Sequence, residues 1–185
     1  RRARGTRAAR ADRRRGSGPG RQRRTREVNG RSASAHASRR EGRRLALAAI
    51  FEAEFGQTSA MRALERHLAG SEDPEANGHA RELVIAVTRH RDQLDALIER
   101  AAPAYPVVQL ARIDRALLRL ALGELLHSAT TPRGAAISEW VELARSYSGE
   151  PARRLLNGIL GRVAAESTGT DRASLRSGGG VKGGS

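Results

Sequence analysis

The sequence predicts an all-α protein of about six or seven helices. Apolar residues recur at steps of three and four over most of residues 40–166, which is the spacing of helices with one buried face. No segment shows the strict alternation of a half-buried strand. About 130 residues, from Arg39 to Ser167, are enough for one domain with its own core.

The first three predicted helices cover residues 40–55, 59–69 and 79–102. Ser59 is a suitable N-cap for the second helix. A loop carrying Gly70 to Gly78 precedes the third helix, and Pro103 ends it because proline cannot continue a helix.

The central predicted helix covers residues 109–127, and its leucines spread around two sides, which indicates burial on both. After a break at residues 130–134, Ile137, Trp140 and Val141 begin the apolar face of another helix. We expect Trp140 to lie in the core. Ser148-Gly149 ends this helix, and Pro151 fits the first turn of the last one.

Charge is concentrated at the N-terminal end. Residues 1–44 hold 17 Arg and three acids, a net charge of +14, whereas residues 45–185 hold 17 basic and 17 acidic residues. Such an arginine-rich segment cannot bury enough apolar surface to offset the entropy of ordering, so residues 1–38 are predicted to be a disordered tail. Residues 167–185 are predicted to be a second, Gly/Ser-rich tail.

The arginine-rich tail is suited to binding a polyanion. Three alternatives are a tail that only aids solubility, a wrongly assigned translation start and an organellar transit peptide. No apolar run near 18 residues indicates a membrane span, and with no cysteine a disulfide framework is excluded, which fits a cytoplasmic protein.

Three blocks of sequence together resemble the NusB family. Residues 137–147 and 150–160 resemble its C-terminal signature, which typically reads Ile-Asn-Glu-Ala-Val-Glu-Leu-Ala-Lys and then Phe-Val-Asn-Gly-Val-Leu. Residues 113–125 resemble the central helix of the family, and residues 43–51 its opening helix. The resemblance covers roughly residues 39–166, and it implies a helical RNA-binding domain made of two small bundles packed together.

The resemblance implies a non-enzymatic factor of bacterial transcription antitermination and ribosomal RNA synthesis. Such a factor binds the single-stranded boxA element of RNA together with the ribosomal protein NusE, in the antitermination complex of RNA polymerase. The matching RNA-binding positions are Arg39, Arg40, Arg43, Arg44, Tyr147, Arg153, Arg154 and Asn157. The matching positions for the protein partner are Phe51 and Asp114. For Tyr147 and Phe51, burial in the core is the competing interpretation.

The chemistry of arginine independently supports RNA binding at the start of the first predicted helix, where Arg39, Arg40, Arg43 and Arg44 lie. A guanidinium binds phosphate through two hydrogen bonds and stacks on bases, both of which single-stranded RNA offers. Cations at the start of a helix oppose its dipole, so these arginines need another reason to be there.

Catalytic patterns are absent from the sequence. No two of the five histidines stand three or four residues apart, and no glycine-rich phosphate loop is present, so neither a metal nor a cofactor is predicted. Two alternatives to an antitermination factor remain: the RNA-binding appendage of a ribosomal RNA methyltransferase, and a helical scaffold that binds only protein.

Overall fold

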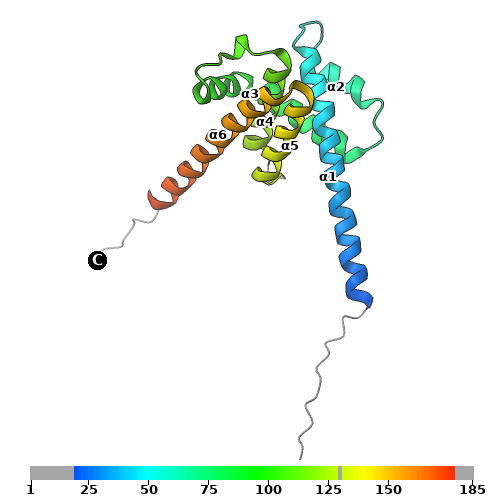
Figure 1. Cartoon of the computed structure of the whole chain (residues 1–185). Coiled ribbons are helices and arrows are strands. Elements are labelled where there is room, and N and C mark those ends of the chain that lie inside the picture. The colour runs from blue at the N-terminus through cyan, green and yellow to red at the C-terminus, as the bar shows by residue number, and fades with distance from the viewer. Residues whose placement is uncertain (1–18, 129–130, 178–185) are drawn as a thin grey trace, which may run out of the picture. The chain divides into compact units, whose positions relative to one another are not determined.

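The protein is all-α in the part of the chain that the structure describes, which is residues 19–128 and 131–177 of a computed structural model; side chains are placed within residues 32–166. Figure 1 shows the helices in order. They are α1 (Pro19–Ala53), α2 (Ala60–Leu68), α3 (Pro74–Ala101), the short 3-10 helix η1 (Val107–Gln109), α4 (Arg112–His127), α5 (Arg133–Ser148) and α6 (Glu150–Ser177). None of these helices is both long and apolar enough to cross a bilayer.

The two outer helices are longer than the sequence predicts. α1 begins at Pro19 rather than near residue 40, and α6 ends at Ser177 rather than near residue 166. Helical backbone thus runs through residues 19–38 and 167–177, inside the segments predicted as tails, and the remaining parts of both tails lie outside the described residues. The chain divides into two compact units, Arg1–His36 and Ala37–Ser185.

Caps define three of the other helix ends. Ser59 caps α2 as predicted, with its hydroxyl accepting from the N–H of Arg62 at 3.3 Å. Gly149 ends α5 with a φ of +89°, a conformation that favours glycine. α3 starts at Pro74, five residues before the predicted start, because the carboxylate of Asp73 accepts from the N–H groups of Glu75 and Ala76.

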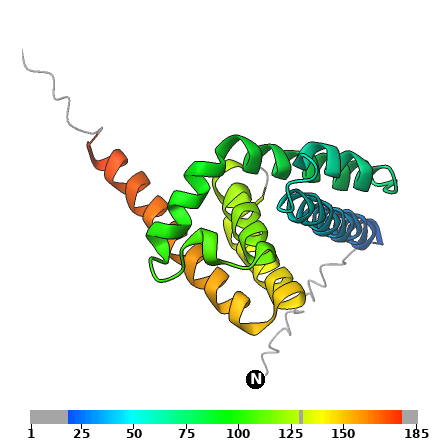
Figure 2. The same ribbon diagram turned by 90° about the horizontal axis from the view of Figure 1, so that it is seen from above.

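The helices of the second unit form two packed groups, as the predicted fold class requires. α2 pairs with α1 through Arg66 and Glu52 and with the first half of α3 through Glu65 and Arg81, while α4, α5 and α6 pack on one another and the second half of α3 pairs with α4 and α6. Figure 2 shows α3 crossing from the side of α1 and α2 to the side of α6. α3 departs from helical geometry at His90, which divides its two halves.

A single apolar core joins both groups. Trp140 is fully buried, which confirms its predicted place, and α4 contributes the longest buried run. The core extends from Ala46 on α1 to Val163 on α6.

Candidate nucleic-acid interface

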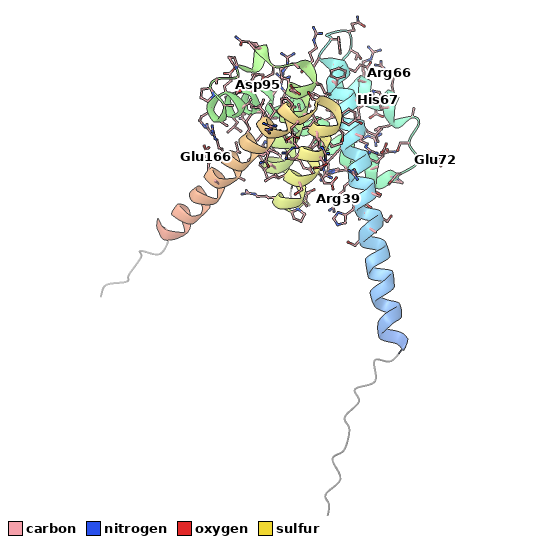
Figure 3. All side chains as sticks on the ribbon, in the orientation of Figure 1. Arg39, Arg66, His67, Glu72, Asp95 and Glu166 are labelled. Atoms are coloured by element: carbon pink, nitrogen blue, oxygen red, sulfur yellow. The ribbon has the colours of Figure 1, made fainter. Side chains whose placement is uncertain are left out.

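The predicted arginines on α1 do not all face the same way. Arg40 and Arg44 are exposed, with about half of each side chain accessible, and Arg39 is partly exposed. Figure 3 labels Arg39 on α1. Arg40 and Arg44 each have a carboxylate nearby: Arg40 lies 3.6 Å from Glu139 of α5, and Arg44 lies 3.5 Å from Glu41.

Arg43 is buried, and its prediction as an RNA-binding residue is corrected here. Only 2% of the residue is exposed, and its guanidinium donates two hydrogen bonds, of 2.8 and 2.7 Å, to the carboxylate of Glu124 on α4. A side chain sealed in this way cannot reach RNA. Helical spacing gives the reason. Arg43 lies one turn before Leu47, and Leu47 just under one turn before Ile50, so all three residues lie on the buried face of α1.

Glu124 is the centre of a buried polar cluster that also includes Trp140 and His79. The indole N–H of Trp140 donates to Glu124 Oε2 at 2.6 Å, and His79 Nε2 lies 3.4 Å from Oε1 without a hydrogen bond. Burial raises the pKa of Glu124, but the neighbouring His79 and Arg43 outweigh it and lower the pKa to about 2. The cluster joins α1, α3, α4 and α5 at one point.

The second predicted group lies on α5 and α6. Tyr147 is 52% exposed, so it is not part of the core, and Asn157 is also exposed. Arg153 donates to Glu150 at 2.8 and 2.7 Å, and Arg154 at 3.3 Å. These bonds, led by that of Arg153, lower the pKa of Glu150 to about 2.

The structure does not bring the two arginine groups into contact. Glu139, beside Arg40, and Tyr147 lie on the same helix, eight residues and so about 12 Å apart.

The predicted partner positions lie on different helices, Phe51 on α1 and Asp114 on α4. Phe51 is half-buried and meets the ring of Phe55 edge-on at 5.3 Å, while Arg112 lies 4.7 Å above the Phe55 ring. Asp114 lines a groove of about 720 Å³ between the end of α3, the start of α4 and α6. Its Oδ1 is buried without a hydrogen bond to any described residue, so it is an acceptor without a donor.

A second ionic cluster fixes the helices that carry Phe51 and Asp114. Arg119 donates two bonds of 2.7 Å to Asp95 and also contacts Glu54, and Arg115 donates to Glu54 at 2.9 Å. Asp95 is labelled on α3 in Figure 3. The cluster therefore ties the end of α1 to α3 and α4.

The match to a family model decides which family this geometry belongs to. The model of the NusB family matches residues 40–165. The chain belongs to the NusB family.

Individual relatives agree with this assignment. The transcription antitermination protein NusB of Myxococcus xanthus is 39% identical over 132 residues, which is 69% of this chain and 94% of the relative. The solved structure of T. maritima NusB is 32% identical, with a TM-score of 0.65 over 69% of this chain and 91% of that one. A structure of the antitermination factors NusB and NusE in complex with dsRNA is 22% identical, with a TM-score of 0.63, and covers 69% of this chain and 96% of that chain.

Two features of this NusB-family chain were missed by sequence reasoning. Trp140 stands where the typical NusB signature has Ala, and its role as a donor to a buried carboxylate was not foreseen. The second is the buried carboxylate of Glu124, which the sequence could have indicated because Glu124 is the single acid in the mainly apolar segment from Leu117 to Leu126.

The histidines form no metal site in the described part of the chain. The imidazoles of His90 and His127 stack at 3.9 Å, and no three metal-binding side chains are grouped among the described residues.

Proposed function

We propose that this NusB-family protein is a transcription antitermination factor that binds boxA-type, single-stranded RNA together with the ribosomal protein NusE. The observation that carries the proposal is the set of arginines displayed where α1 enters a domain of the NusB family. It acts by binding rather than by catalysis, and its place of action is the bacterial cytoplasm, within the antitermination complex of RNA polymerase.

Two lines of support come from the relatives. The M. xanthus relative is named a transcription antitermination protein, and the NusB and NusE structure contains dsRNA. The physical support is the chemistry of arginine, whose planar group pairs with phosphate and stacks on bases.

The proposed RNA surface omits Arg43. It consists of Arg39, Arg40, Arg44, Tyr147, Arg153, Arg154 and Asn157. The exposed ring of Tyr147 is available to stack on a base, which buried aromatic residues are not. The proposed partner surface includes Phe51, and Asp114 with its acceptor oxygen in the groove.

The test measures binding of a boxA-type RNA and a scrambled RNA by fluorescence anisotropy, with and without NusE. Joint replacement of Arg39, Arg40 and Arg44 by alanine is expected to weaken boxA binding by at least tenfold, since each phosphate contact is lost. The matched control replaces Arg62, Arg81 and Arg100, which are exposed on α2 and α3, and so removes the same charge.

Equal losses in the two triple variants would contradict the proposed surface, because they would show an effect of net charge alone. Binding that is unchanged in both would contradict the role in RNA binding. Circular dichroism checks that both variants remain helical.

A further inference from the structure

The pair formed by Arg40 and Glu139 differs from an ordinary surface ion pair. The Nε of Arg40 lies 3.6 Å from Oε2 of Glu139, with 52% and 36% of the side chains exposed. That distance is too long for a hydrogen bond. Oε2 of Glu139 is nonetheless shielded from water and accepts no hydrogen bond from any described residue. It is an acceptor without a donor, at the edge of the proposed RNA surface.

The buried Glu124 cluster holds together the segments of α1 and α5 that carry Arg40 and Glu139. Trp140, the next residue on α5, donates to Glu124, and Glu124 also binds Arg43, which lies one turn after Arg40 on α1. The buried cluster therefore sets the spacing between α1 and α5 at the level of the pair. Arg40 and Glu139 face each other because of this cluster and not because two flexible side chains happened to meet.

We propose that Glu139 is a specificity-determining residue for RNA: it competes with phosphate for Arg40, and once displaced it accepts a hydrogen bond from a base amino group or a ribose 2′-hydroxyl. The inference rests on the proposed RNA-binding function. A carboxylate and a phosphate bind a guanidinium in the same way, so an incoming phosphate competes with Glu139 for Arg40.

Discrimination follows from what each RNA offers to the displaced carboxylate. An RNA that places only phosphate near Glu139 brings like charges together and leaves the acceptor without a donor. An RNA that places an amino group or a 2′-hydroxyl there supplies the missing donor, as carboxylates accept from the amino group of cytosine. Glu139 thus weakens binding of unrelated RNA more than binding of the matching RNA.

The experiment compares Glu139→Gln with the parent protein, using a boxA-type RNA oligonucleotide and a scrambled RNA of the same length. An exposed ion pair contributes little, so losing the competitor is expected to strengthen scrambled-RNA binding by about two- to fivefold. Binding of the boxA-type RNA is expected to stay the same or weaken, because glutamine keeps only one acceptor oxygen. The ratio of the two affinities should therefore fall by at least about twofold.

Glu65→Gln is the matched control. Glu65 lies on α2 in an exposed ion pair with Arg81, at 3.1 Å, and neither residue belongs to the proposed RNA surface. The same charge change there should leave the affinity ratio unaltered. In an Arg40→Ala background, Glu139→Gln should increase scrambled-RNA binding by less than half as much as it does in the parent, because the competition has been removed.

Three outcomes would overturn the inference. One is an equal gain for both RNAs in Glu139→Gln, and another is an equal change in the ratio for Glu65→Gln. The third is an unchanged ratio of boxA-type to scrambled-RNA affinity in Glu139→Gln when Arg40→Ala does weaken RNA binding. In that case the inference fails and the proposed RNA surface is retained. If Arg40→Ala and the triple arginine variant have no effect on either RNA, the proposed function fails as well.

Discussion

Arg43 and Glu124 form an ion pair in which both charges are removed from water. Such a pair contributes less net stability than its short distances suggest, because desolvation offsets the attraction. The pair becomes costly to break by removing one partner, since the other charge is then buried without a counterion. Both side chains are below 4% exposed, so neither can turn toward solvent without moving a helix.

Replacing Glu124 by glutamine is therefore expected to reduce the free energy of unfolding by about 3 to 5 kcal/mol. The shape of the side chain is kept, so the loss reports the unpaired charge of Arg43 together with the weakened hydrogen bond from Trp140. Urea denaturation followed by circular dichroism measures it. Glu142→Gln, on an exposed surface, should change stability by less than about 1 kcal/mol; a similarly small effect at Glu124 would contradict this account.

The same pair predicts a sensitivity to acid. The pKa of Glu124 is lowered from 4.5 to about 2 in the fold, so its contribution to stability is present above about pH 4.5 and is lost as the pH falls toward 2. In thermal melts over this range, the parent should lose more stability than Glu124→Gln does. Parallel curves for the two proteins would show that Glu124 does not titrate in this window.

Gly42 marks a close approach of α1 to α3. A Cβ at this position would lie 2.7 Å from the carbonyl oxygen of Ala76 and 3.1 Å from Cβ of His79. Gly42→Ala is expected to destabilise the protein by about 1 to 2 kcal/mol, because the strain exceeds the helix preference of alanine. Gly161→Ala on α6, where the space is open, should be neutral or stabilising by up to about 1 kcal/mol in the same melts. Equal effects at the two positions would contradict the close approach.

At the scale of helices, patterns of apolar residues predicted the elements better than their ends. The start of α3 was placed at residue 79 because Gly70 and Gly78 read as a loop, although Asp73 followed by Pro74 is a cap signal within it. The inward turn of Arg43 was not foreseen because charged residues are normally assigned to the exposed face. Only the facing carboxylate, 81 residues away in sequence, makes that burial possible.

The cap of α3 gives a prediction at this scale. Asp73→Ala removes the acceptor for two backbone N–H groups and is expected to cost about 1 kcal/mol. Asp92→Ala, on an exposed part of the same helix, should be neutral or slightly stabilising because alanine favours helix. Thermal melts compare the two, and equal melting temperatures would argue against the cap.

At the scale of the molecule, positive charge is divided between the first unit and the folded domain. Residues 1–44 carry a net charge of +14 and the remaining chain is neutral, so most of the long-range attraction for RNA comes from the N-terminal part. The domain, with its paired arginines, supplies fixed geometry. This division predicts that the N-terminal part contributes mainly to the affinity for any RNA, and the domain mainly to the preference for one RNA sequence over another.

Removal of residues 1–36 is expected to make RNA binding less dependent on salt. Each phosphate contact on a single strand contributes about 0.7 to the slope of log affinity against log salt, so a segment that contacts roughly five phosphates contributes about 3.5. The shortened protein should also show a larger ratio of boxA to scrambled-RNA affinity. Identical slopes over the same salt range would show that this segment does not bind RNA.

Trp140 is the only tryptophan of the chain, and its indole is sealed against a carboxylate at the point where four helices meet. Intrinsic fluorescence of the unlabelled protein therefore reports one location, the Glu124 cluster. The emission of a buried indole shifts to longer wavelength when water reaches it. Loosening of the helices that carry the arginines can thus be followed optically, in the same cuvette in which RNA is titrated.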